Sequence, residues 1–181
     1  MNLPNKLTLL RVLMIPFFVV LLKLGDGWAQ YAAVGVYVLA CITDTLDGHI
    51  ARSRNLVTNF GKFMDPIADK LLVMSAMVVL TAQGRMPDWV CILMLAREFM
   101  VSGFRLVAVE NGRVIAAGML GKIKTVLQML STIALMLFVP VNGEIGPLGI
   151  FAQVLMYAAL VMTVWSGADY IIRNRECIKD M

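Results

Sequence analysis

The stretch from Thr43 to Lys70, TDTLDGHIARSRNLVTNFGKFMDPIADK, places four aspartates between two long apolar runs. Most of the chain around it is apolar, since 60% of its 181 residues are hydrophobic and its mean hydropathy is +0.80. Soluble domains are only about half apolar, so we expect a lipid bilayer around these runs. A helix that crosses the hydrocarbon needs roughly 20 apolar residues, and this length allows about six such spans.

Six apolar runs are predicted to be transmembrane helices. Glycine, proline, asparagine and aspartate mark the gaps between them, as in LGDGW, GRMPDW and PVNGEIGPLG. The predicted helices cover residues 7–24, 29–47, 65–84, 88–109, 121–141 and 148–172. We therefore expect an all-α, polytopic membrane protein in which residues 1–181 form a single membrane domain.

The basic residues predict the orientation of these helices, because positive residues in short loops stay on the cytoplasmic side. Most of the 16 basic residues, including Arg11, lie near the two termini, in the aspartate stretch, or around the link between the fourth and fifth runs. Lys23 and Arg85 fall on the other side. Both termini and the aspartate stretch are thus expected at the cytoplasmic face of the cell membrane. Membrane lipids explain the net charge of +4, and no nucleic-acid partner is predicted.

The four aspartates form two pairs at helical spacing. Asp44 and Asp47 are three apart at the end of the second predicted helix, and Asp65 and Asp69 are four apart at the start of the third. These spacings place each pair on one helix face. If the two helices are antiparallel neighbours, the four carboxylates converge at the cytoplasmic edge of the membrane. Clustered carboxylates repel one another, so a cation must compensate them.

Carboxylates in such a cluster suit hard divalent cations, and Mg²⁺ is favoured where a substrate phosphate completes the coordination shell. Two metals about 4 Å apart can clamp a transferring phosphoryl group, and a further carboxylate can act as general base on an alcohol. The alternative, that the acids cap helices or pair with nearby arginines, suits one aspartate better than four. A divalent-cation transporter stays open, although its acids would line a path near mid-membrane.

The residues DTLDGHIARSRNLVTNFGKFMDPIAD follow the pattern D-x2-D-G-x2-A-R-x8-G-x3-D-x3-D, which resembles the signature of the CDP-alcohol phosphotransferase family. Every fixed position is present: Asp44, Asp47, Gly48, Ala51, Arg52, Gly61, Asp65 and Asp69. The resemblance extends over nearly the whole chain, because the family's core is six transmembrane helices. It implies one family domain, a homodimer and CDP-diacylglycerol as a substrate.

The resemblance also implies roles for individual residues. Asp44, Asp47, Asp65 and Asp69 would bind Mg²⁺ or Mn²⁺, with two ions expected, and Asp69 would also be the catalytic base. The residues implied to bind CDP-diacylglycerol are Asn5, Thr8, Gly48, Ala51, Arg52, Thr58 and Gly61. Asn5 and Thr8 come from NKLTLLR, which resembles the family's juxtamembrane Asn-x2-Thr element, and helix capping is the alternative for both.

The later segment LAREFMVSGFRLVAVENGRVIAAGMLGKIKTVLQM resembles the branch of the family whose acceptor is glycerol 3-phosphate. A phosphorylated acceptor requires a cationic pocket. The candidates are Arg97, Arg105, Arg113, Lys122 and Lys124. Arg97 lies inside an apolar run and needs a partner there, but the adjacent Glu98 is not expected to face it on a helix.

The expected reaction is therefore transfer of the phosphatidyl group of CDP-diacylglycerol to the sn-1 hydroxyl of glycerol 3-phosphate, which gives phosphatidylglycerol phosphate and CMP. Inositol phosphate and serine are the alternative acceptors. For Lys122 and Lys124, anchoring at the cytoplasmic face is the alternative role.

Overall fold

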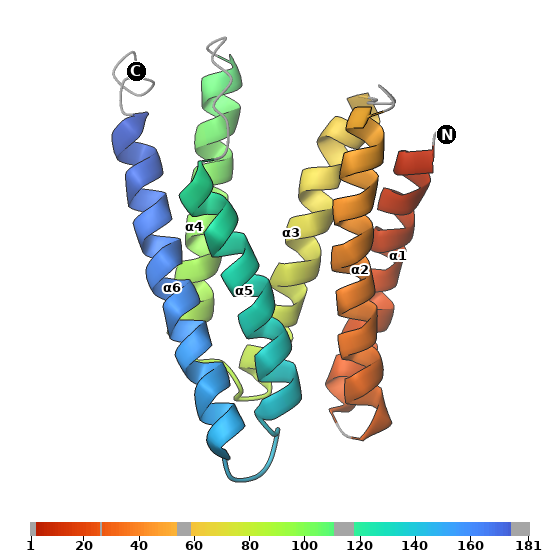
Figure 1. Cartoon of the computed structure of the whole chain (residues 1–181), viewed down its shortest axis with the longest axis vertical. Coiled ribbons are helices and arrows are strands. Elements are labelled where there is room, and N and C mark those ends of the chain that lie inside the picture. The colour runs from red at the N-terminus through yellow and green to blue at the C-terminus, as the bar shows by residue number, and fades with distance from the viewer. Residues whose placement is uncertain (1–2, 26, 54–58, 111–117, 175–181) are drawn as a thin grey trace. The chain divides into compact units, whose positions relative to one another are not determined.

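The computed structural model describes residues 3–25, 27–53, 59–110 and 118–174, with side chains for 8–25, 27–43, 67–68, 70–108 and 118–174. Within these ranges the chain forms six α-helices and no strand (Figure 1). The helices are α1 (Leu3–Leu24), α2 (Trp28–Ser53), α3 (Asn59–Ala82), α4 (Asp88–Glu110), α5 (Met119–Phe138) and α6 (Pro147–Arg173). The predicted all-α class is confirmed.

The helices around the aspartate stretch are longer than hydropathy predicts. The predicted helix end at residue 47 and the predicted helix start at residue 65 are wrong, because α2 continues to Ser53 and α3 already begins at Asn59. Hydropathy marks the apolar part of a helix, whereas backbone hydrogen bonding continues into polar residues. All four aspartates consequently lie inside helices.

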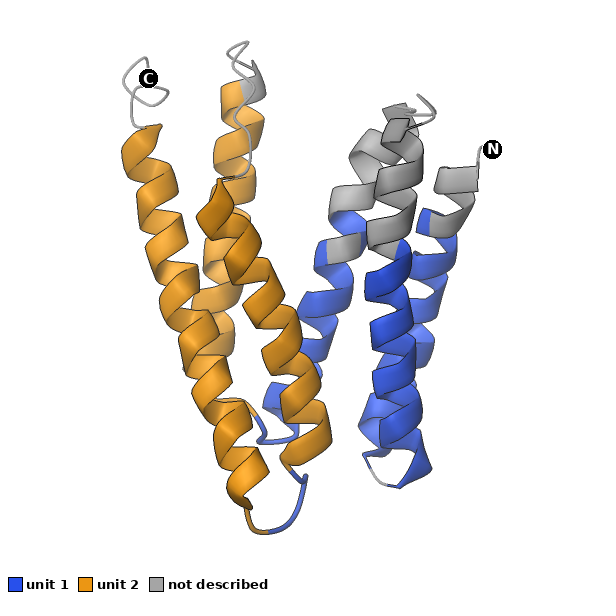
Figure 2. Cartoon of the chain, viewed as in Figure 1, with its two compact units in different colours: residues 1–85, 140–143 blue, residues 86–139, 144–181 orange. Residues whose placement is uncertain are grey.

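The chain divides into two compact units (Figure 2). Unit 1 contains residues 1–85 and 140–143, and within it α1 packs against both α2 and α3. Unit 2 contains residues 86–139 and 144–181, and within it α6 packs against α5 and α4. A tight turn joins α1 to α2, where Gly25 and Gly27 have φ angles of 78° and 56°, a left-handed conformation that favours glycine.

The apolar faces of several helices are not covered by protein. Within the described residues, α5 and α6 are long and apolar enough to cross a membrane. Only 33% of the most apolar 18-residue stretch of α6 is buried. Phe151 and Trp165 on α6 are 58% and 64% exposed. Shorter apolar helical segments lie at Trp28–Thr43 and Lys70–Ala82. Exposed apolar stripes of this kind suit contact with lipid, and the predicted number of six spans stays a prediction.

Candidate functional site

The first half of the aspartate motif continues the buried stripe of α2. Ala33, Tyr37 and Ala40 are fully buried and are separated by four and then three residues. The same steps of four and three lead to Asp44 and Asp47, which are helical. Because residues at this spacing share one face of a helix, both aspartates lie on the same face of α2 as these buried residues.

The second half of the motif continues the buried stripe of α3. Val73, Ala76 and Leu80 are buried, and steps of four toward the N-terminus lead from Val73 to Asp69 and Asp65. The two aspartate pairs therefore lie on the helix faces that carry the buried stripes of α2 and α3 in the same unit. Four carboxylates offer oxygen donors only, and this donor set fits a hard divalent cation such as Mg²⁺ or Mn²⁺.

Helix α1 supplies the third interior face of unit 1. Thr8, Ile15, Phe18 and Leu22 are buried along one stripe, and Thr8 is only 1% exposed. The ring of Phe18 lies 5.6 Å from the ring of Tyr37 on α2, which fixes how the two helices are aligned. Thr8 thus lies on the interior face of α1, while its role toward CDP-diacylglycerol stays a prediction.

The side chains of the other predicted site residues lie outside the described part of the structure. Backbone but not side chains are described for Asn5, Asp44, Asp47, Gly48, Ala51, Arg52, Gly61, Asp65 and Asp69. Thr58 and Arg113 lie outside the described residues altogether.

In unit 2, Glu98 joins two of the predicted acceptor residues. Its Oε1 atom accepts a hydrogen bond from Nζ of Lys124 on α5 and another, at 3.2 Å, from Nη1 of Arg97. The side chains of Lys124 and Glu98 are only 3% and 14% exposed. The expectation that Arg97 and Glu98 do not meet is wrong, because both long side chains bend toward the same point although their Cα atoms are adjacent.

Helix α6 provides the other support for Arg97. Nη2 of Arg97 donates to Oγ of the buried Ser166 at 2.9 Å. The next residue is Gly167, and a Cβ atom there would lie 3.0 Å from Cγ of Arg97, closer than most real contacts. Nε of Arg97 is buried without a hydrogen-bond partner in the described structure. Ser166 and Gly167 therefore form a close-fitting seat for an arginine in an apolar environment.

The remaining described candidates have different surroundings. Arg105 donates from Nε to the hydroxyl of Tyr170 at 3.4 Å, and its guanidinium carbon lies 5.6 Å from the centre of that ring. Phe104 meets the same ring edge-on at 5.7 Å. Lys122, in contrast, is exposed. The structure thus brings Arg97 and Lys124 together, places Arg105 at Tyr170, and leaves Lys122 at the surface.

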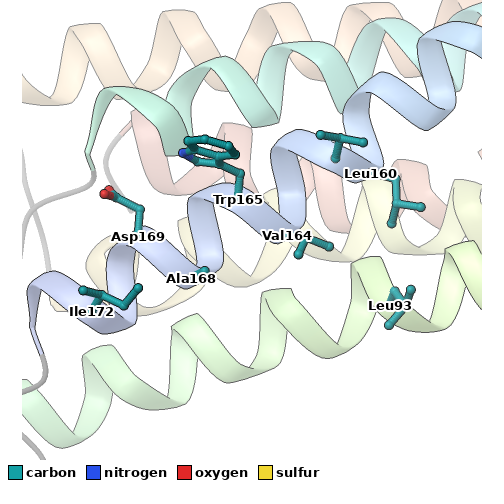
Figure 3. Close-up of a pocket in the computed structure, with 8 residues that line it drawn as sticks. Leu93, Leu160, Val164, Trp165, Ala168, Asp169 and Ile172 are labelled. Atoms are coloured by element: carbon teal, nitrogen blue, oxygen red, sulfur yellow. The ribbon is translucent and has the colours of Figure 1, made fainter.

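A larger groove and a smaller cavity lie within unit 2. A groove of about 640 Å³ lies along α4 and α6, and Leu93, Leu160, Val164 and Trp165 are among the mainly apolar side chains that line it (Figure 3). A smaller cavity of about 360 Å³ lies between the start of α5 and the end of α6, and Tyr170 forms part of its wall. The smaller cavity has a link to a predicted acceptor residue, because Tyr170 in its wall accepts a hydrogen bond from Arg105.

Comparison with known proteins identifies the family. The model of the CDP-alcohol phosphatidyltransferase family matches residues 1–165, which is most of the chain. The chain belongs to this family. Members generally use divalent metal ions, which agrees with the donor set of the aspartate motif.

Relatives of this CDP-alcohol phosphatidyltransferase cover nearly its full length. A CDP-diacylglycerol–glycerol-3-phosphate 3-phosphatidyltransferase of Bacillus subtilis is 41% identical, over 98% of this chain and 97% of its own. A probable phosphatidylglycerophosphate synthase of Mycobacterium tuberculosis is 44% identical, over 95% of this chain and 81% of its own. A CDP-diacylglycerol–glycerol-3-phosphate 3-phosphatidyltransferase of Shigella flexneri is 39% identical, over 99% and 98%.

Sequence reasoning on this family member missed the residues that hold its cations in place. Glu98 is recognisable as an acid in an apolar run, but its partner Lys124 is 26 positions away in the sequence. Ser166 lies 69 positions from Arg97, and Tyr170 lies 65 positions from Arg105. The small-residue pair Ser166–Gly167 gave a second local signal, because small residues on an apolar helix permit close approach.

Proposed function

We propose that this chain transfers the phosphatidyl group of CDP-diacylglycerol to the sn-1 hydroxyl of glycerol 3-phosphate. The products are phosphatidylglycerol phosphate and CMP. The observation that carries the proposal is the full-length similarity of about 40% to transferases of this name. The four aspartates on the interior faces of α2 and α3 support the same chemistry.

In the proposed reaction, Asp69 accepts the proton of the sn-1 hydroxyl of glycerol 3-phosphate. The oxygen then attacks the phosphorus that carries diacylglycerol, a new P–O bond forms, and the P–O bond to CMP breaks. Asp44, Asp47, Asp65 and Asp69 would hold two ions, Mg²⁺ or Mn²⁺, that neutralise charge on the phosphate oxygens.

The nucleotide end of CDP-diacylglycerol is assigned to the motif and to the start of α1. Gly48, Ala51 and Gly61 leave room for the nucleotide, and Arg52 binds phosphate oxygens. Asn5, Thr8 and Thr58 complete the proposed set. The burial of Thr8 on the interior face of α1 supports this assignment.

The phosphate of the acceptor is assigned to the basic residues of unit 2, namely Arg97, Arg105, Arg113, Lys122 and Lys124. The described contacts support different roles for these residues. Arg105 is held by a neutral hydroxyl, so its charge is available for a phosphate. Arg97 donates both to Ser166 and to the carboxylate of Glu98, which also accepts from Lys124, so two cations share one anion and positive charge remains for a phosphate. Lys124 is buried against Glu98, so we assign it to positioning Arg97 through that carboxylate.

The proposed setting is the cytoplasmic membrane, with six spans, both termini and the active site at the cytoplasmic face, and residues 1–181 acting as one domain in a homodimer. The uncovered apolar faces of α5 and α6 support the membrane location. A reaction at the membrane edge also suits the substrates, because glycerol 3-phosphate is soluble and CDP-diacylglycerol stays in lipid.

The test is release of CMP by the purified chain with CDP-diacylglycerol and Mg²⁺, with glycerol 3-phosphate, inositol phosphate, inositol and serine offered in parallel. We expect release with glycerol 3-phosphate alone, and none when a chelator removes the metal. Release with serine or inositol phosphate instead would keep the aspartate chemistry and refute the assignment of the acceptor. No release with any acceptor would refute the transferase and favour a transporter.

A further inference from the structure

Arg11 has an environment that its place near the N-terminus does not explain. It counts among the basic residues expected at the cytoplasmic side, yet it is 1% exposed and is the largest fully buried side chain of the described residues. It continues the interior stripe of α1, three residues after Thr8 and four before Ile15. A guanidinium buried in a membrane protein is costly unless an anion compensates it.

The sequence of unit 1 leaves few choices for that anion. Its residues 1–85 and 140–143 contain no glutamate, and their only acids are Asp26 and the four aspartates of the motif. Asp26 comes after the end of α1 in the sequence, and that end, at Leu24, is about 20 Å along the helix from Arg11. The motif is therefore the available source of negative charge.

The alignment of the helices places the motif at the level of Arg11. The rings of Phe18 and Tyr37 are in contact, which fixes the antiparallel pair α1 and α2. Arg11 lies seven residues before Phe18, and Asp44 lies seven residues after Tyr37. At 1.5 Å per residue, both lie about 10 Å from the ring contact in the same direction.

Two further contacts give the same alignment. Nε2 of Gln83 donates to the carbonyl oxygen of Leu22 at 2.6 Å, so these two residues lie at about the same level. Asp69 and Thr8 each lie 14 residues earlier in the sequence, and so they also lie at about the same level. Nη2 of Arg85 donates to Oε1 of Gln30 at 2.8 Å. Arg85 lies three residues past the end of α3, so this contact shows that the end of α3 meets the start of α2, as the same alignment requires.

We propose that Arg11 is the resident counter-cation of the aspartate cluster, level with Asp44, and positions these carboxylates before metal and substrate bind. It offsets part of the repulsion among the four carboxylates of the motif. A divalent ion must then compete with the guanidinium, so Arg11 keeps metal binding weaker than four acids alone would give. This inference rests on the metal-binding role proposed for the motif.

The experiment compares purified full-length wild type with Arg11→Met, measuring Mn²⁺ affinity by electron paramagnetic resonance and Tm with and without Mg²⁺. Arg11→Met should lower Tm without metal, regain most of the loss in saturating Mg²⁺, and bind Mn²⁺ roughly tenfold tighter, since a neighbouring charge shifts a carboxylate by at least one pKa unit. Arg11→Lys keeps the charge and should bind Mn²⁺ close to the wild-type affinity.

Arg85→Met is the matched control, because Arg85 is an equally buried arginine of unit 1, 2% exposed and 16 positions from Asp69. It should lower Tm equally with and without Mg²⁺ and leave Mn²⁺ affinity within about twofold. If Arg11→Met does not fold, Arg11→Met with Asp44→Asn restores the charge balance and should recover the wild-type Tm without metal.

An Arg11→Met protein with wild-type Mn²⁺ affinity and the same Mg²⁺ effect on Tm would overturn the proposal, as would a double variant that does not recover. A wild-type protein that binds no Mn²⁺ gives a different result, because it refutes the metal site itself. The two failures are therefore separable.

Discussion

The seat of Arg97 on α6 gives the sharpest prediction, because Ser166→Ala removes one oxygen atom and little else. Ser166 is 3% exposed, and its Oγ accepts a 2.9 Å hydrogen bond from Nη2 of Arg97. A hydrogen bond to a charged group contributes about 1.5–3 kcal/mol. Nε of Arg97 has no hydrogen-bond partner in the described structure, so no bond from that atom makes up for the one that Ser166→Ala removes.

This magnitude converts directly to kinetics. At 1.4 kcal/mol per factor of ten, the loss corresponds to a rise of about 10-fold to 100-fold in KM for glycerol 3-phosphate, if Arg97 binds its phosphate. KM for CDP-diacylglycerol should be unchanged, because that substrate is assigned to unit 1. The assay is steady-state release of CMP, with each substrate varied in turn.

Ser131→Ala is the control for Ser166→Ala. Ser131 is 1% exposed in the same unit, and its hydroxyl donates to the carbonyl of Gln128 within its own helix. We expect its KM values within about twofold of wild type, as for a site with no shared partners. A folded Ser166→Ala protein with an unchanged KM for glycerol 3-phosphate would refute the proposed role of the Arg97 seat.

Three other predictions concern stability, chemistry and fit. Glu98→Gln should lower the free energy of unfolding by about 3 kcal/mol, because it removes the charge that compensates buried cations. Asp169→Asn, at the exposed pair with Arg173, should lower it by less than about 1 kcal/mol. Thermal denaturation in detergent compares the two variants. Asp69→Asn should abolish CMP release while Tm stays near wild type, and near-normal turnover would remove Asp69 as the base. Gly167→Ala should raise KM for glycerol 3-phosphate by about threefold to tenfold, because its Cβ would displace Arg97, and an unchanged KM would show that the side chain can yield.

The sequence by itself determined what depends on local spacing. Steps of three and four residues predicted the helices, the pairing of Asp44 with Asp47, and the placement of each pair on one face. They could not give helix ends in the polar stretch, because backbone hydrogen bonds do not require apolar side chains, and so α2 runs on to Ser53.

Only the tertiary structure decided which helices meet and at which level. The Glu98–Lys124 pair and the Arg97–Ser166 hydrogen bond join residues 26 and 69 positions apart, and no local pattern specifies such partners. The burial of Arg11 at the level of Asp44 depends in the same way on how α1 packs against α2. Periodicity fixes the face of a helix that turns inward, whereas side-chain packing between helices fixes what that face meets.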